Sequence, residues 1–166
     1  MDPQRRQFLL DEFFQLTLAA TVQRARVYAD GLGEADRAPL RASVPAMLDQ
    51  LWPIYGAPVG EAQHLTNIRQ LADNLSAEHP LLLRDGRFRI GPAQKALNLF
   101  LKYLWCVGLL NVAPPHCPFD FFIIKHLGLN IRWTELEGYQ QLVAAAQAAA
   151  HGAPLARWEL ELYNQQ

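Results

Sequence analysis

The amino-acid sequence predicts an all-α fold: a single compact multi-helix domain over residues 1–166, with one small β-hairpin near residues 83–90. Apolar residues recur at helical spacing in several long segments, and proline or glycine stands between those segments. The chain is 51% hydrophobic and 19% charged, which is a globular composition. A chain of 166 residues can bury a sizeable core without disulfides, so one domain is the simplest organisation.

Three amphipathic helices are expected in the first half of the chain. They cover residues 3–29, 35–51 and 61–76, each with apolar residues near the helical period. Pro45 lies inside the second helix and can redirect it, because proline removes a backbone hydrogen bond and clashes with the preceding turn. The aromatic and proline-rich segment 52–60 is expected to be a loop.

The small hairpin is predicted from the dipeptide Asp85-Gly86, which stands between two short runs and favours a tight turn. Three arginines alternate around this turn: Arg84, Arg87 and Arg89. They can contact a phosphate backbone, or they can simply be solvated on an exposed hairpin.

A central helix is predicted from Pro92, at its first position, to a stop at Gly108. Apolar residues cover most of its circumference, so it should be buried on nearly all sides. One polar strip, about 100° wide, interrupts this pattern and contains Gln94, Lys95, Asn98 and Lys102. Lysines in a core helix are costly unless the strip faces a cleft or a partner, or unless their ammonium groups reach solvent.

After three closely spaced prolines, a further helix is predicted from Pro118 to Gly128. Asp120 lies in its first turn, where the helix dipole favours a carboxylate. Phenylalanines flank Asp120, so we expect it at the mouth of an apolar region, unless it serves only as a helix cap.

Two helices complete the predicted fold. The sequence Thr134-Glu135-Leu136-Glu137 has the form of a capping box and is expected to open a helix that runs through Ala150. Pro154 is expected to start the last helix.

Composition excludes several classes of function. Cys106 and Cys117 are the two cysteines, too few for an iron–sulfur cluster within one chain, so no metal site and no cofactor are expected. No run of about 18 apolar residues lacks a charge, and the N-terminus has no secretory apolar core. We therefore expect a cytoplasmic protein without a membrane partner.

The net charge of −1 conceals an asymmetry along the chain. Residues 81–132 contain seven basic and two acidic residues, whereas the rest contains eight basic and fourteen acidic ones. Such a distribution is typical of a protein with one face toward a polyanion, and it also arises in ordinary solvated surfaces.

Two segments carry a resemblance to a known family: residues 90–97 (IGPAQKAL) and residues 117–129 (CPFDFFIIKHLGL). Their order, a glycine and lysine opening a helix and then a proline-led helix with an early aspartate, resembles the helix-hairpin-helix DNA glycosylase superfamily. The resemblance is greatest to the archaeal 8-oxoguanine glycosylases, which lack an iron–sulfur cluster, and it covers residues 84–130.

The resemblance implies a base-excision enzyme that acts on duplex DNA with a modified base. Carried over by position, the nucleophile is Lys95 and the assisting carboxylate is Asp120. A base that leaves the stack needs an aromatic pocket and polar groups to recognise it. Candidate substrate contacts are Gln94, Asn98, Lys102, Trp105, Phe119 and Phe122, and candidate contacts to the DNA backbone are Arg84, Arg87, Arg89, Gly91 and Lys125.

Two other functions remain open from the sequence. A helical module without catalytic activity can bind nucleic acid through its basic half, with Lys95 on a phosphate. An interaction protein can instead pair its line of Lys95, Asn98 and Lys102 with carboxylates of a partner.

Overall fold

The computed structural model describes residues 1–22 and 25–165. This part of the chain forms seven α-helices, which confirms the all-α prediction. They are α1 (Pro3–Val22), α2 (Ala38–Leu51), α3 (Glu61–Glu78), α4 (Ile90–Cys106), α5 (Phe121–His126), α6 (Leu136–Ala149) and α7 (Leu155–Asn164). Short 3₁₀ turns cover Ala35–Arg37, Trp52–Gly56 and Arg84–Gly86.

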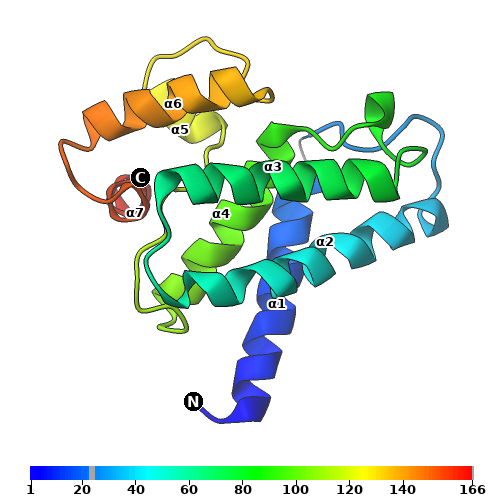
Figure 1. Cartoon of the computed structure of the whole chain (residues 1–166), viewed down its shortest axis with the longest axis horizontal. Helices are drawn as coiled ribbons and strands as arrows, with labels where there is room; N and C mark the ends of the chain where they lie inside the picture. The colour runs from blue at the N-terminus through cyan, green and yellow to red at the C-terminus, as the bar shows by residue number, and fades with distance from the viewer. Residues whose placement is uncertain (23–24, 166) are drawn as a thin grey trace.

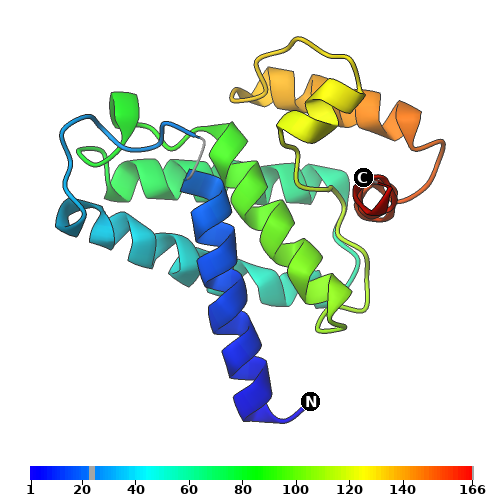
Figure 2. The ribbon, with the colours of Figure 1, turned by 180° about the vertical axis from the view of Figure 1, so that it is seen from behind.

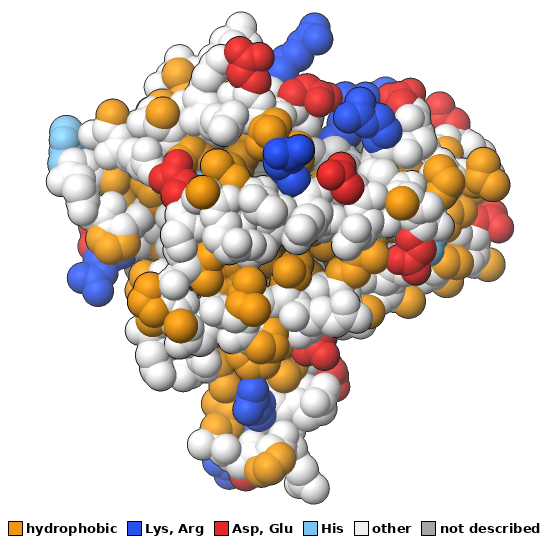
Figure 3. Space-filling model, in the orientation of Figure 1, with side chains coloured by type: hydrophobic (Ala, Val, Ile, Leu, Met, Phe, Trp, Pro, Cys, Tyr) orange, Lys and Arg blue, Asp and Glu red, His pale blue; other side chains and the backbone are white. Residues whose placement is uncertain are grey.

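The helices pack in layers. α2 and α3 run side by side on one face, and α1 and α4 cross behind them (Figures 1 and 2). α5, α6 and α7 gather at the end of the molecule away from the N-terminus, and the first turns of α1 project beyond the other helices (Figure 1). Hydrophobic side chains continue from the middle of the visible face onto this projecting end (Figure 3), where Phe8 is 63% exposed.

α4 lies at the centre of the core, as the sequence predicts. Leu97, Phe100, Leu101 and Leu104 have no exposed surface. The ring of Phe100 stacks on Phe14 of α1 with centroids 4.5 Å apart. Burial of large apolar side chains on this helix from both layers is the main stabilising contribution to the fold.

Lys102 of α4 lies inside the protein. From the sequence, we expected it to face a cleft or a partner, or to reach solvent. Its Nζ donates to both carboxylate oxygens of Glu159 on α7, at 2.6 and 2.9 Å, and lies 5.1 Å from the ring centroid of Tyr163. Lys102 and Glu159 are 9% and 5% exposed. A buried cation needs such a partner, so this ion pair fixes α7 against α4.

Of the hairpin predicted near residues 83–90, the turn is present but the two paired strands are not. Asp85 and Gly86 both adopt positive φ, and the Arg87 amide donates to the Arg84 carbonyl at 3.2 Å. The flanking residues do not pair with each other. Leu83 instead forms an isolated antiparallel bridge with Tyr28. A two-stranded hairpin of this length is only marginally stable by itself, so its residues pair with another segment.

Several helix ends also differ from the sequence prediction. The first helix ends at Val22, because residues 27–29 form backbone hydrogen bonds with residues 82–84. The predicted capping box does not form, because Glu135 is the N-cap of α6 and its side chain makes no capping hydrogen bond. The helix expected from Pro118 begins at Phe121, one residue after its cap.

None of the described helices is long and apolar enough to cross a bilayer.

Candidate functional site

A cavity of about 320 Å³ lies where the first turn of α4 meets the start of α5. Lys95 and Asp120 both line it. We name it the Lys95 cavity; its other walls are Ala20, Thr21, Ala25, Arg26, Gly91, Pro92, Phe119, Phe121, Trp133 and Thr134. Its volume is at the lower end of the range for small-molecule sites, and its walls combine aromatic rings with a few polar groups, as binding sites do.

Asp120 enters this cavity as the N-cap of α5. Its Oδ1 accepts hydrogen bonds from the amides of Phe122, at 3.0 Å, and Ile123, at 3.2 Å. Both bonds use the same oxygen, so the cap does not require Oδ2. The capping role and a role in the cavity, which the sequence left as alternatives, are therefore compatible.

Two glycines allow the 132–134 segment to lie close to its neighbouring helices, Gly91 on α4 and Gly138 on α6. A Cβ at Gly91 would lie 3.2 Å from both Cα and Cγ2 of Thr134, tighter than an ordinary contact. A Cβ at Gly138 would overlap the carbonyl oxygen of Arg132. The absence of side chains at these two positions therefore permits the close approach of the 132–134 segment, which closes the cavity.

A second cavity, of about 310 Å³, adjoins the first and contains the arginines of the turn. We name it the arginine cavity; it is lined by Ala25, Arg26, Val27, Arg84, Asp85, Arg87, Arg89, Pro92 and Thr134. The bridge between Tyr28 and Leu83 holds the segment of Arg26 beside that of Arg84. Four arginines and one aspartate line this cavity, so its walls have a net positive charge, which suits a phosphate group.

Not all of these arginines are equally available to a ligand. Arg89 forms ion pairs with Asp85, at 2.8 Å, and Glu135, at 3.1 Å, and Arg84 approaches Asp30 at 3.5 Å. No ion pair of Arg26 or Arg87 is found within residues 1–22 and 25–165. Exposed ion pairs contribute little, so an anionic ligand can compete for Arg84 and Arg89 and finds Arg26 and Arg87 already accessible.

Gln94 and Asn98, expected as substrate contacts, lie in the interior with no exposed surface. Gln94 bonds to both backbone groups of Phe119: its Nε2 donates to the carbonyl at 2.8 Å, and its Oε1 accepts from the amide at 3.2 Å. Asn98 Nδ2 donates to Gln94 Oε1 at 3.1 Å and to the Tyr139 hydroxyl at 3.2 Å. Both side chains therefore bind protein groups, and neither lines the Lys95 cavity.

This buried network has one consistent set of proton positions. A backbone amide only donates and a carbonyl only accepts, so Phe119 fixes the orientation of the Gln94 amide, and Gln94 then fixes Asn98. Asn98 Oδ1 must accept from His64 Nε2, at 2.8 Å. His64 Nδ1 is then the acceptor for the Tyr55 hydroxyl, at 2.7 Å.

His116 lies at the other end of the network. Its Nδ1 lies 2.6 Å from the Tyr139 hydroxyl, which accepts from Asn98 and has its own hydrogen left to donate to His116. The hydrogen of neutral His116 is then on Nε2, which is buried and finds no partner among the described residues. A buried donor without a partner costs free energy.

Both histidines are held neutral. Burial lowers the pKa of His64 to about 3, with a smaller contribution from His116, whereas the bond to Asn98 opposes the shift. Burial lowers the pKa of His116 to about 4. The two rings meet edge to face with centroids 4.6 Å apart, so a proton on either one would repel a proton on the other.

These two pKa values predict a loss of stability in mild acid. A histidine in the unfolded chain titrates near 6.5, so below that pH the unfolded chain binds protons that the folded chain does not, until pH 4 or 3 is reached. The free energy of unfolding is therefore expected to fall with pH below 6.5, by up to about 1.4 kcal/mol per pH unit for each histidine.

Urea unfolding between pH 7.5 and 4.5 measures this slope. His116→Asn keeps an acceptor for Tyr139 and removes one titrating group, so we expect it to reduce the slope by about 1.4 kcal/mol per pH unit at most. His151→Gln is the control, because His151 is exposed. Equal slopes in His116→Asn and the unsubstituted chain would contradict the conclusion that burial lowers the pKa of His116.

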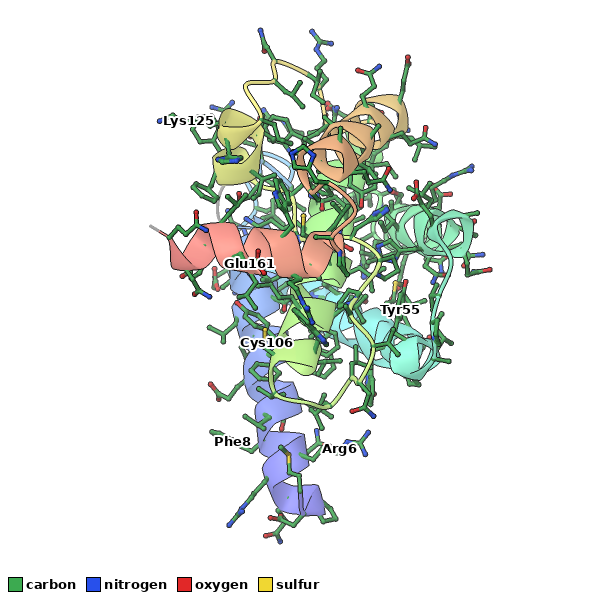
Figure 4. All side chains as sticks on the ribbon, turned by 90° about the vertical axis from the view of Figure 1, so that its left-hand side faces the viewer. Arg6, Phe8, Tyr55, Cys106, Lys125 and Glu161 are labelled. Atoms are coloured by element: carbon green, nitrogen blue, oxygen red, sulfur yellow. The ribbon has the colours of Figure 1, made fainter. Side chains whose placement is uncertain are left out.

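The other expected site residues are divided between the cavities and the rest of the surface. Phe119 and Gly91 line the Lys95 cavity. Trp105 and Phe122 are half-buried and pack against the core, and neither is among the cavity walls. Lys125 is exposed on α5 and its side chain projects into solvent (Figure 4).

The cavity walls include residues that we did not predict from the sequence: Thr21, Arg26, Phe121, Trp133 and Thr134. Thr21 is 1% exposed, and its hydroxyl finds no hydrogen-bond partner in the described part of the chain. No local sequence pattern distinguishes these residues, because separate segments bring them together. In the described residues, no group of three His, Cys, Asp or Glu side chains could hold a metal ion.

Comparisons with protein-family models, with curated proteins and with solved structures each find no match to this chain.

Proposed function

We propose that this protein is a DNA glycosylase with an associated lyase activity, in which Lys95 attacks the sugar of a modified nucleotide. The observation that carries the proposal is that Lys95 of α4 and Asp120 of α5 line the same cavity, beside the rings of Phe119, Phe121 and Trp133. An amine, a carboxylate and aromatic walls in one recess are the groups that such an excision needs.

In the proposed reaction, a nucleotide leaves the duplex and its base enters the Lys95 cavity. Lys95 Nζ, in its neutral form, bonds to C1′ as the glycosidic bond breaks, and the base departs with the bonding electron pair and takes up a proton. Asp120 stabilises the positive charge that develops on the sugar. Loss of a proton and opening of the sugar ring then give an imine between Lys95 and C1′. Removal of a C2′ proton from this imine expels the 3′ phosphate.

Borohydride trapping tests this proposal directly, because hydride reduces the imine to a stable secondary amine. The protein is incubated with a panel of duplexes, each with one modified base, in the presence of borohydride. We expect a covalent protein–DNA adduct with at least one duplex, and we expect peptide mapping to locate it at Lys95. The absence of an adduct with every duplex and with an abasic duplex would overturn the proposal.

A second candidate function is binding of nucleic acid without catalysis, which the arginine cavity favours. If Arg87 contacts a phosphate, the slope of log K against log salt concentration for duplex binding is about −0.9 per contact. Arg87→Gln is then expected to weaken binding and to make that slope less negative by about one unit.

Duplex binding measured by fluorescence anisotropy between low and moderate salt checks this expectation. Arg69→Gln is the matched control, because Arg69 is exposed on α3 and lines neither cavity. Binding with a normal salt slope and no borohydride adduct would favour the second candidate over the glycosylase. An unchanged slope in Arg87→Gln would remove the arginine cavity from the DNA interface.

A further inference from the structure

We infer that Gln94 is a positioning residue that holds Asp120 in the cavity that Lys95 also lines, by clamping the backbone of Phe119. This inference rests on the proposed function, because it assigns how the two groups of the Lys95 cavity are kept in register. Gln94 precedes Lys95 on α4, and Phe119 precedes Asp120, so one pair of hydrogen bonds joins the neighbours of both groups.

The geometry of the clamp is specific. One primary amide satisfies both the amide and the carbonyl of Phe119, which are otherwise outside any helix, since α5 begins at Phe121. A bidentate contact of this kind fixes both the position and the orientation of a peptide segment. The adjacent Asp120 is then ready to cap α5 with Oδ1, at the wall that it shares with Lys95.

The buried network supports the clamp from behind. Asn98 holds Gln94 Oε1, and His64 and Tyr139 hold Asn98 from α3 and α6. Since the Phe119 amide can only donate and its carbonyl can only accept, Gln94 can adopt one amide orientation only.

The pH dependence of the Gln94→Glu variant tests whether these two hydrogen bonds position Asp120. A neutral glutamic acid can still donate to the Phe119 carbonyl and accept from its amide, whereas the carboxylate loses the donor and faces the carbonyl oxygen. Burial raises the pKa of such a carboxyl, so the neutral form persists well above the usual range. Gln94→Met removes the clamp at every pH with a side chain of similar size.

The rate of borohydride trapping is measured from pH 5.5 to 8.5 and divided by the rate of the unsubstituted chain at the same pH. We expect Gln94→Met to be slower by at least about tenfold throughout, because small displacements of reacting groups are costly. Gln94→Glu is expected to exceed Gln94→Met at the acidic end and to approach it as the carboxyl ionises. Duplex affinity, which depends on the arginine cavity, should stay within about twofold in both variants.

Gln147→Met is the matched control, because Gln147 is an exposed glutamine on α6 whose amide donates to Glu61. Trapping by Gln94→Met at the rate of the unsubstituted chain would overturn the inference. So would a Gln94→Glu variant that is no faster than Gln94→Met at pH 5.5, since its neutral acid should restore the clamp.

Amide hydrogen exchange separates this inference from the proposed function. Without the clamp, residues 117–122 are expected to exchange faster in Gln94→Met, while α7 keeps its protection. If the unsubstituted chain forms no adduct with any duplex, the proposed function is wrong, and Gln94 then has no reaction to position. Faster exchange in Gln94→Met would in that case show that the clamp exists but is only structural. Unchanged exchange would show that no clamp exists.

Discussion

Lys95→Ala is expected to abolish the borohydride adduct completely while the protein stays folded. Lys95 is one of only three lysines in the chain, and it alone lines the cavity that Asp120 shares. No other described amine borders that cavity, so none is positioned to replace it. Trapping on the duplex that gives the strongest adduct measures the loss, and circular dichroism confirms the fold.

Lys125→Ala is the control for this experiment, because Lys125 is exposed on α5 and lies outside the Lys95 cavity. It is expected to trap at the rate of the unsubstituted chain. An adduct that persists in Lys95→Ala, and that maps to the N-terminal amine or to Lys125, would refute the assignment of the nucleophile.

Asp120→Asn separates the charge of Asp120 from its capping role. An asparagine oxygen can still accept from the amides of Phe122 and Ile123, so α5 should keep its start. The negative charge that stabilises the developing cation is lost, and a slower trapping rate is therefore expected at unchanged stability. An equal rate would leave Asp120 as a helix cap only.

Lys102→Met is expected to cause the largest loss of stability, about 3–5 kcal/mol in the free energy of unfolding. The substitution leaves Glu159 buried without its cation. Burial already raises the pKa of Glu159, and Lys102 opposes that shift. Without Lys102 the pKa rises further, so the loss should be greatest at high pH and smaller where Glu159 can be protonated.

A double substitution tests whether the loss comes from the unpaired carboxylate. Lys102→Met combined with Glu159→Leu removes both charges, and it is expected to recover most of the stability that Lys102→Met loses. Arg5→Met is the comparison for an exposed ion pair, since Arg5 and Asp2 are 82% and 49% exposed, and it should change stability by less than about 1 kcal/mol. Urea unfolding measures all three variants. A Lys102→Met variant as stable as Arg5→Met would contradict this account.

The helices could be predicted from the sequence because their signals are local. Apolar periodicity and the Asp85-Gly86 turn depend on neighbours within a few residues. The bounds of the central helix were less exact: α4 begins at Ile90, two residues before the predicted Pro92, and ends at Cys106. The end of α1 could not be predicted in this way. Its boundary depends on hydrogen bonds between residues 27–29 and residues 82–84, which lie more than fifty positions apart.

The site could be predicted in part for the same reason. The sequence brought Lys95 and Asp120 together as candidates, and the structure places both at one cavity, whereas their roles stay predictions. The polar strip of α4 was expected to face one environment, yet Lys95 faces the cavity while Asn98 and Lys102 face the interior. Their partners, His64 and Glu159, are 34 and 57 residues away, and only the packed structure reveals them.

The glycines at 91 and 138 have a consequence for the width of the Lys95 cavity. Gly91 lets Thr134 lie against the helix that bears Lys95, and Gly138 lets Arg132 lie against α6, so the position of the 132–134 segment depends on two missing methyl groups. Loops usually tolerate exchange of small residues, but here the smallest enlargement would push Trp133 and Thr134 outward. The shape of this recess therefore depends on Gly138, which lies outside its walls, as well as on Gly91, which is one of them.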